Sequence, residues 1–446
     1  MKQPTSSPNP PAEHPPFAAY VGIDWADQKH YWSLRTADGK PQRGELDHTP
    51  EAIQVWAAEL ERRFSGQPVA VALEQARGAL IAMLSKYSHL VLFAIHPNTL
   101  SHYRQAFTPS RAKSDSHDAD LALELVFAHP DKLRRLDPDT VETRQLQFLT
   151  EERRRLVNEQ SSQSQRLQAW LKQVFPQLLQ WFRCPTSVLV RKLLERWPTL
   201  QQLQKAPPSK VRRFLERHGW GNAERIQQLL VEIGKAVPAS QDAALLKSGS
   251  LFLGNSVRAL EQIGDSIARL DQAIEQTYRE HPDRAIVESL PGAGPALEPR
   301  LVAALGTQRA RFDSAESLAS FVGIAPVTEA SGQSRWVHWR WACPKFLRQT
   351  FHEWAACSIR VCGWAREHYD QQRKKGKGHH AGVRSVAFKW IRILFRCWRD
   401  RVPYCEQTYL SRRPARAPQG EKAAPAAVGF GWKSCAGFSK PSAFSA

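Results

Sequence analysis

The stretch FAAYVGIDWADQKHYWSLRTADG, residues 17–39, decides the fold of the first part of the chain. It holds an apolar run that ends at Asp24, a short acidic segment, and a second alternating run that ends in a turn at Asp38 and Gly39. Apolar runs bounded by turn residues predict two neighbouring strands that open a sheet as a hairpin.

The segments that follow alternate between helical and strand patterns. A helical pattern covers about 50–64, the compact apolar run PVAVALE at 68–74 reads as a strand, a helix is expected near 79–88, and HLVLFAIHP at 89–97 reads as another strand. A further helix is expected from about Ser114. Strands that alternate with helices after an opening hairpin predict an α/β domain with a mixed sheet.

Four carboxylates stand out in this domain. Asp24 ends the first strand, Glu74 ends a later strand, and Asp115 and Asp118 lie three residues apart in KSDSHDAD, where a helix would place both on one side. Acids at neighbouring strand ends and on such a helix can meet at one edge of the sheet. Clustered carboxylates are stable mainly when a divalent cation neutralises them, and oxygen ligands suit Mg²⁺ or Mn²⁺. Two such ions can bridge a scissile phosphate.

Other interpretations of these acids stay open. Each one alone can be an ordinary exposed carboxylate, and Asp115 and Asp118 can be a pair that the dipole at a helix N-terminus favours. Asp27 and Asp120 lie close by, and spacing alone does not exclude them.

A long polar helix is expected at about 141–175 and a second at about 251–279. In the first, two sets of residues recur at intervals of seven, which predicts a coiled-coil seam with a polar middle. These sets are Leu149, Leu156, Gln163 and Trp170, and Leu146, Arg153, Gln160, Leu167 and Val174. The two helices could pair antiparallel, with the proline-interrupted segment at about 177–249 forming a helical insertion at the tip.

The net charge of +19 is concentrated near the end of the chain. Residues 335–446 hold 22 Lys and Arg but 6 Asp and Glu, and they carry 8 of the 15 tryptophans. Cations interleaved with aromatic rings suit a surface that neutralises phosphates and stacks on bases, so nucleic acid is the expected partner. A basic tail that binds polyanions nonspecifically is the alternative.

Two short motifs in the last third could contact phosphate. PGAGP at 291–295 is either a turn between helices or a motif that brings backbone N–H groups to a DNA backbone. Ser331 in EASGQSRWVHWRW is either an ordinary turn serine or a nucleophile on phosphorus, with Arg335, His338 and Arg340 to stabilise the added charge. Ser334 competes with Ser331 for that role.

The chain contains no apolar stretch long enough for a membrane span, and its first residues are rich in proline where a signal peptide would be apolar. We therefore expect a soluble, intracellular protein.

The motifs VGIDWA, VALEQ, KSDSHDAD, PGAGP, FVGIAP and ASG occur in this order. As an ordered set, over about residues 18–130 and 285–355, they resemble the DEDD transposases of bacterial insertion sequences, which are bridge-RNA-guided recombinases. The resemblance implies an RNase H-like (RuvC-like) α/β N-terminal domain, a long coiled-coil middle region and a small, mainly α C-terminal transposase domain. It also implies a Mg²⁺ or Mn²⁺ tetrad and a nucleophilic serine, which map here to Asp24, Glu74, Asp115, Asp118 and Ser331.

The family further implies strand exchange through a phosphoserine intermediate. It implies double-stranded DNA and a structured guide RNA as partners, a homo-tetramer, and a cytoplasmic, nucleoid-associated location. One departure concerns the run after the serine, where the family usually shows a basic, glycine-containing segment and this chain has WVHWRWACPKFLRQTFHEWA. Phosphate contacts there do not carry over one by one, and the candidate nucleic-acid-binding residues are Arg335, His338, Arg340, Lys345 and Arg348.

The expected organisation is a disordered leader at 1–16, the catalytic α/β domain at 17–135, the coiled coil at 136–284, the transposase domain at 285–405 and a disordered basic tail at 406–446. Two other functions remain open. One is a metal-dependent, junction-resolving nuclease in which water attacks and Ser331 is structural, and the other is a non-catalytic nucleic-acid-binding protein.

Overall fold

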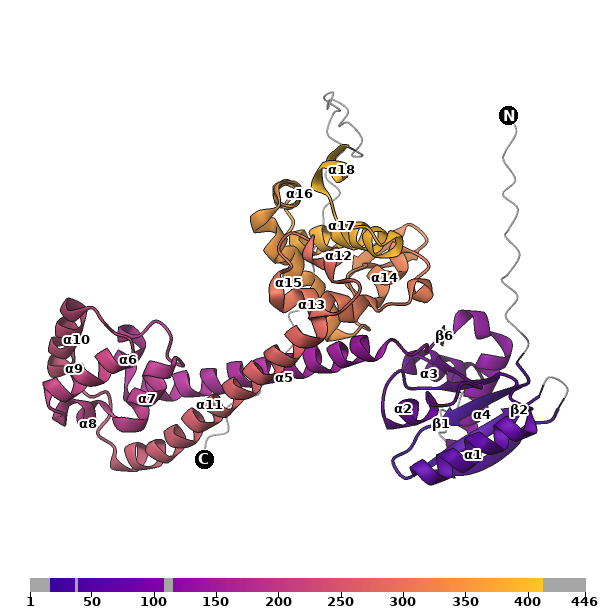
Figure 1. Cartoon of the computed structure of the whole chain (residues 1–446), viewed down its shortest axis with the longest axis horizontal. Helices are drawn as coiled ribbons and strands as arrows, with labels where there is room; N and C mark the ends of the chain where they lie inside the picture. The colour runs from indigo at the N-terminus through magenta and orange to yellow at the C-terminus, as the bar shows by residue number, and fades with distance from the viewer. Residues whose placement is uncertain (1–16, 37–38, 108–114, 412–446) are drawn as a thin grey trace.

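The computed structural model describes residues 17–36, 39–107 and 115–411, except for the side chains of Phe107, Asp115 and Ser116. The expected leader at 1–16 and most of the expected tail lie outside these ranges. Figure 1 shows an α/β part, a pair of long helices that leads to a helical tip, and a second helical part that sits over the near end of the pair. Within the described ranges, every helix is too short or too polar to cross a lipid bilayer.

The α/β part is built on a six-stranded mixed sheet with the order β3-β2-β1-β4-β5-β6. β1 pairs antiparallel with β2, as the hairpin prediction requires, and parallel with β4. The strands are β1 (Ala19–Asp24), β2 (Lys29–Arg35), β3 (Gln42–Asp47), β4 (Val69–Leu73), β5 (Leu90–Ala94) and β6 (Arg134–Arg135). β3 escaped prediction because its sequence, QRGELD, has one buried apolar residue, Leu46.

Helices cover both faces of this sheet and enclose two apolar cores. α1 (Pro50–Arg63) and α2 (Ala79–Leu84) pack on one face, and α4 (Asp115–Ala128) packs on the other. α3 (Pro97–Phe107) precedes α4 and contacts it. Every residue of β4 is buried, as expected for a central strand covered on both sides.

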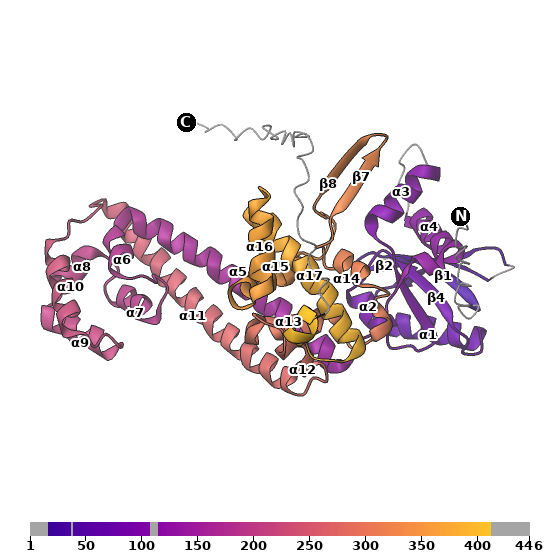
Figure 2. The same cartoon turned by 90° about the horizontal axis from the view of Figure 1, so that it is seen from above.

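The two long helices α5 (Val141–Val174) and α11 (Ala243–Arg279) lie side by side and run in opposite directions (Figures 1 and 2). The buried residues of α5 gather at its two ends, so its middle is polar, as the heptad pattern predicts. An ion pair between Arg153 and Asp271 bridges the two helices there. α11 begins eight residues before the predicted start, because the carboxylate of Asp242 caps it by accepting from Ala244 N at 2.9 Å.

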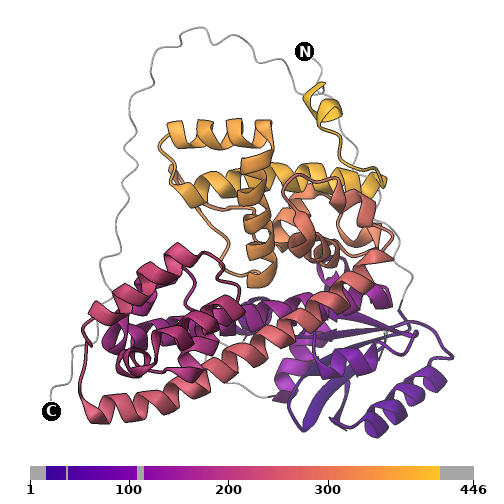
Figure 3. The ribbon, with the colours of Figure 1, turned by 60° about the vertical axis from the view of Figure 1, so that its left-hand side comes forward.

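The segment between the long helices forms the tip (Figure 3). Its helices share an apolar core with the adjoining ends of α5 and α11. Its helices are α6 (Pro176–Trp181), α7 (Val188–Arg196), α8 (Leu200–Lys205), α9 (Pro208–Arg217) and α10 (Ala223–Lys235). This agrees with a helical insertion broken at its prolines.

The C-terminal part is mainly helical and carries one hairpin. Its helices are α12 (Arg284–Glu288), α13 (Gly294–Leu305), α14 (Ala315–Phe321), α15 (Lys345–Val361), α16 (Gly363–Lys374), α17 (His379–Asp400) and α18 (Glu406–Ser411), and the hairpin strands are β7 (Val327–Ser331) and β8 (Ser334–His338). Short 3₁₀ turns lie at Pro130–Lys132 and Arg309–Arg311. α18 corrects the expectation that disorder begins at 406.

The tryptophans that the structure describes in the basic region divide into two groups. Trp354, Trp364, Trp390 and Trp398 are buried in the core of the C-terminal part, whereas Trp336, Trp339 and Trp341 are exposed. Half of the eight tryptophans counted from the sequence therefore stabilise the fold, and the count overstated the stacking surface.

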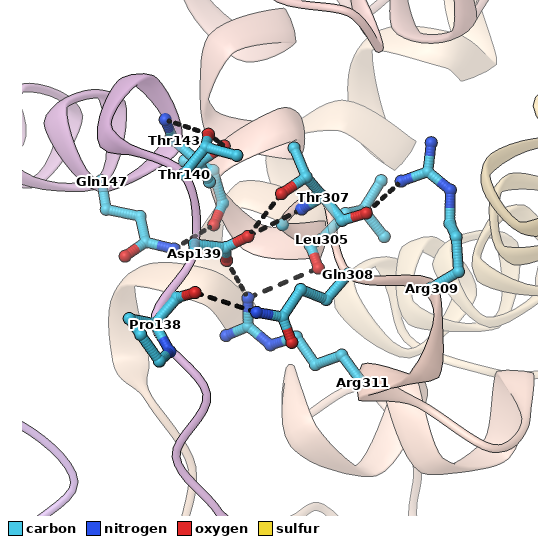
Figure 4. A network of polar contacts seen from close by, with 12 residues as sticks. Pro138, Asp139, Thr140, Thr143, Gln147, Leu305, Thr307, Gln308, Arg309 and Arg311 are labelled. Atoms are coloured by element: carbon cyan, nitrogen blue, oxygen red, sulfur yellow. Dashed lines mark hydrogen bonds and ion pairs between the residues drawn. The ribbon is translucent and has the colours of Figure 1, made fainter. Parts of the chain in front are cut away.

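A polar joint connects the start of α5 to the C-terminal part (Figure 4). The carboxylate of Asp139 accepts from the backbone N–H of Thr307 at 2.8 Å, from the Thr307 hydroxyl at 2.9 Å and from Nη1 of Arg311 at 3.0 Å. Nε2 of Gln308 donates to the carbonyl of Pro138 at 2.8 Å. Asp139 follows β6 closely, so this joint sets how the α/β part meets the rest of the chain.

Candidate functional site

Two of the predicted acids lie next to each other at one edge of the sheet. β1 and β4 are parallel, and Ile23 pairs with Leu73. The next residues along the two strands are Asp24 and Glu74, and both side chains are partly exposed. Because the carboxyl ends of neighbouring parallel strands meet at one edge, the strand pattern predicted this pairing correctly.

Asp118 lies on α4, which packs across β1. The helix crosses β1 at Gly22 so closely that a Cβ atom there would lie 2.1 Å from the carbonyl oxygen of Ala119. Asp118, beside Ala119, is almost fully buried, and Nε of Arg104 donates to its Oδ1 at 2.6 Å. Asp115 is the first residue of α4, and its side chain lies outside the described part.

The two competing acids have other surroundings. Asp120 forms a two-pronged ion pair with Arg43, with distances of 2.8 and 3.0 Å, and so ties α4 to β3. Asp27 is exposed in the loop after β1. Asp120 therefore has a structural partner, and Asp27 lies beyond the strand end.

The loop after Asp24 is held by a buried histidine that sequence reasoning missed. The backbone N–H of Ala26 donates to Nδ1 of His30 at 3.2 Å, so Nε2 of His30 carries the proton and donates to Nδ1 of His48 at 2.8 Å. Burial, with a smaller effect from His48, lowers the pKa of His30 to about 4. Neutral His30 can therefore accept this backbone hydrogen bond near neutral pH.

The acids are chemically suited to a divalent cation, since all four are carboxylates and hard oxygen donors suit Mg²⁺ or Mn²⁺. Among the side chains that the structure describes, no three histidines, cysteines or carboxylates are grouped to hold a metal ion. Arg104 neutralises Asp118 in this conformation. Metal binding by Asp118 would thus require the guanidinium of Arg104 to move away from the carboxylate.

Ser331 lies at the tip of hairpin β7–β8, which projects from the C-terminal part (Figure 2). It pairs across the hairpin with Ser334, and the two-residue turn between them contains Gly332 with φ of +55°, a value that favours glycine. Both serines are exposed and lie on the same face of the ribbon. This position suits an ordinary turn serine, and it also leaves the Ser331 hydroxyl accessible to a ligand.

His338 is held by two acceptors. Its Nε2 lies 3.0 Å from Oε1 of Glu329 and its Nδ1 lies 2.8 Å from the carbonyl oxygen of Trp339. Carboxylate and carbonyl oxygens accept only, so both ring nitrogens donate and the ring is an imidazolium in this geometry. The Glu329 hydrogen bond, followed by that to Trp339, raises the pKa of His338. Its positive charge therefore persists to a higher pH than that of an ordinary histidine, but its N–H groups are already engaged.

The other predicted cations lie near the tip of the hairpin and beyond its end. Arg335 is exposed on β8, Lys345 begins α15, and Nη1 of Arg348 donates to the carbonyl of Arg340 at 3.0 Å. The structure adds Arg384 from α17, whose guanidinium lies over the ring of Trp339 together with that of Arg348. No local pattern links Arg384 to this hairpin, because the contact depends on how α17 packs against α15.

PGAGP packs against α15 as a turn between α12 and α13. The carbonyl of Pro291 accepts from Nε1 of Trp354 at 3.2 Å, and Ala293 is buried. This favours the interhelix turn over a phosphate-binding motif.

Two family profiles match this chain, one over the region of the acids and one over the region of Ser331. A family profile described as "Transposase" matches residues 21–176, which include all four acids, and that of the "Transposase IS116/IS110/IS902 family" matches residues 284–370, which include Ser331.

Three relatives are similar over most of the chain. The "Mini-circle putative transposase for IS117" of Streptomyces coelicolor is 29% identical over 406 residues, covering 88% of this chain and 96% of the relative. The "Insertion element IS110 uncharacterized 43.6 kDa protein" of the same species is 27% identical over 404 residues, with coverage of 89% and 96%. The "Insertion element IS900 uncharacterized 42 kDa protein" of Mycobacterium paratuberculosis is 27% identical over 398 residues, with coverage of 86% and 96%.

Proposed function

Because the chain belongs to the IS116/IS110/IS902 transposase family, we propose that it moves an insertion element by exchanging DNA strands through a serine-linked intermediate. The observation that carries the proposal is the edge of the sheet where Asp24 and Glu74 sit on neighbouring parallel strands with α4 packed across β1. The strand order β3-β2-β1-β4-β5 supports an RNase H-like, RuvC-like fold for this domain, which spans about 17–135.

In the proposed reaction, Oγ of Ser331 attacks a scissile phosphorus. An Oγ–P bond forms, the P–O3′ bond breaks, the serine loses its proton, and the 3′ oxygen leaves as a hydroxyl. A 3′-hydroxyl from the second duplex then attacks the phosphoserine and frees Ser331, so each phosphodiester is conserved. The exposed position of Ser331 at the hairpin tip supports this role.

Asp24, Glu74, Asp115 and Asp118 would hold Mg²⁺ or Mn²⁺. A bound cation would stabilise charge on the attacking and leaving oxygens. Arg104 has a role of its own here, because it balances the buried charge of Asp118 until the cation replaces it.

This role of Arg104 predicts how Arg104→Gln behaves. The variant should lose thermal stability in EDTA and regain most of it with Mn²⁺, and it should bind Mn²⁺ more tightly than the wild type in calorimetry. Arg43→Gln, which affects the pair with Asp120, is the matched control. Equal Mn²⁺ affinity in wild type and Arg104→Gln would contradict the exchange.

The serine belongs to the C-terminal part and the acids to the α/β part, and we propose that a complete site combines the two within a homo-tetramer on two DNA duplexes. The long antiparallel pair of α5 and α11 supports a coiled coil that mediates assembly, over about 136–284. A structured guide RNA would pair with target and donor DNA, and the protein would act in the cytoplasm at the nucleoid.

Trapping a covalent adduct tests the mechanism. The protein is incubated with guide RNA and a labelled DNA substrate that carries the element ends, and is then denatured. The label should stay covalently attached to the wild type and to Ser334→Ala, but not to Ser331→Ala. Loss of the adduct with Ser334→Ala and not with Ser331→Ala would move the role to Ser334. Cutting and joining at the wild-type rate by Ser331→Ala would indicate the water-based nuclease. Unchanged strand exchange by Asp24→Asn would refute the metal site.

A further inference from the structure

Three large aromatic side chains stand in solvent at the serine hairpin and just after it. Trp336 is 60% exposed, Trp341 is 68% exposed and Trp339 is 36% exposed. The indole is the largest side chain, and its exposure leaves apolar surface in water that a ligand would cover. Trp336 lies on β8 itself, and Trp339 and Trp341 follow that strand, which pairs with the strand of the proposed nucleophile.

Two arginines from different helices converge on the middle ring. The guanidinium carbon of Arg348, on α15, lies 4.5 Å from the centre of the Trp339 ring, and that of Arg384, on α17, lies 5.5 Å from it. Burial lowers the pKa of Arg384, and the positive charge of Arg348 lowers it further. Throughout the described ranges, neither arginine forms an ion pair with a carboxylate. Two like charges held together in this way call for an anion from outside the chain.

Histidines on the same two helices lie close to this positive charge. The rings of His352 on α15 and His380 on α17 lie 5.4 Å apart. Burial lowers the pKa of His352, and the nearby charges of His380 and Arg384 lower it further. The lowered pKa favours neutral His352, so the positive charge beside Trp339 comes from Arg348 and Arg384, and such a pair of cations suits a phosphate.

Trp341 offers a flat face beside these cations. Its ring meets Trp339 edge to face, with centres 4.9 Å apart and planes at 89°. An exposed indole can stack on a nucleic-acid base, but bases within a duplex are covered by their neighbours, so the geometry selects an unpaired base. Strand exchange necessarily produces unpaired nucleotides.

We propose that Trp339, Trp341, Arg348 and Arg384, here named the tryptophan–arginine cluster, bind an unpaired nucleotide of the nucleic-acid substrate. The two arginines bind its phosphate and Trp341 stacks on its base. This inference rests on the proposed function, since it makes the cluster a substrate subsite beside Ser331. Five residues of extended chain separate Trp339 from the level of Ser331, or about 17 Å, so one oligonucleotide can contact both.

Binding of short oligonucleotides to the full-length protein tests the cluster. Fluorescence anisotropy would follow labelled single-stranded oligo-dT, oligo-rU and a duplex of equal length. We expect Trp341→Ala to weaken binding of the single strands by about 5- to 100-fold, with the duplex almost unaffected and Trp341→Phe close to wild type. A larger effect on oligo-dT would identify the nucleotide as DNA, and a larger effect on oligo-rU as RNA.

Arg384→Gln should weaken single-strand binding and reduce its salt dependence by about one phosphate contact. The matched control is Arg392→Gln, because Arg392 lies on the same helix, is exposed and pairs with Glu316. Wild-type affinity of Trp341→Ala for single strands, or an equal loss for the duplex, would overturn the proposal. A change in oligomer mass with unchanged binding would instead assign the rings to a protein interface and also overturn it.

The adduct assay separates this proposal from the function on which it rests. If an adduct forms at Ser331 but Trp341→Ala binds single strands as the wild type does, the role of the cluster is refuted and the serine mechanism is supported. If single-strand binding depends on Trp341 but no adduct forms, the serine mechanism is refuted and the role of the cluster is supported.

Discussion

Replacing Gly22 by alanine should displace the helix that carries two of the proposed metal ligands. The new Cβ would lie 2.1 Å from the carbonyl oxygen of Ala119 and 2.3 Å from the backbone nitrogen of Leu123, and protein Cβ atoms essentially never approach other atoms within 3.0 Å. Both obstacles are backbone atoms of α4, so no side-chain rotation relieves the clash. The helix must therefore move by about 1 Å.

The cost follows from this displacement. Overpacking a well-packed contact costs about 3 kcal/mol at the upper end of the usual range, and a shift of about 1 Å in a reacting group can reduce activity about 100-fold. Gly22→Ala should thus lower the midpoint of urea unfolding of the α/β part, speed hydrogen exchange in α4, and reduce strand exchange far more than the loss of folded protein explains.

A matched control is available in the tip. Gly234 lies in α10, and a Cβ atom there would have no neighbour within 4 Å. Gly234→Ala should keep full activity and gain up to about 1 kcal/mol from helix propensity. Wild-type stability and activity of Gly22→Ala would refute the reasoning, because α4 would then not depend on this close contact.

Two further outcomes follow from the described contacts. Asp139→Asn leaves the largely buried guanidinium of Arg311 without its carboxylate, so we expect a loss of about 3 kcal/mol in unfolding free energy and faster hydrogen exchange around residues 305–311, whereas unchanged exchange would show that the joint holds without the ion pair. The raised pKa of His338 means that its bond to Glu329 is fully present below pH 6.5 and is lost as the pH rises through the higher pKa of the folded protein; an NMR titration should show this shift, and Glu329→Gln should reduce it to the part that the hydrogen bond to Trp339 supplies.

The sequence predicted the parts of the fold where local pattern and burial agree. The opening hairpin, the buried strand before Glu74 and the helix after Ser114 follow from periodicity, and the register of β1 with β4 then places Asp24 beside Glu74. The order of motifs supplied the family, which no single motif could have done.

The parts that escaped prediction depend on contacts between distant segments. Arg104 meets Asp118 because α3 packs against α4, and Arg384 reaches Trp339 because α17 packs against α15. Hairpin β7–β8 lacks the alternation of buried and exposed residues that marks a strand on a core, since nearly all of its residues are exposed. Tryptophan number likewise cannot distinguish a core ring such as Trp390 from an exposed one.

The ribbon that carries Ser331 has two strands, each paired with the other and with no third strand of the described sheets. Such a ribbon is marginally stable by itself, and fixing each residue costs about 1–2 kcal/mol of conformational entropy. A phosphodiester that contacts the Ser331 hydroxyl but nothing else along the strands would have to offset this entropy cost by that one contact. Only a substrate that contacts the whole ribbon would order it. The weak intrinsic order of the ribbon would therefore favour reaction at DNA sites that bind along both strands.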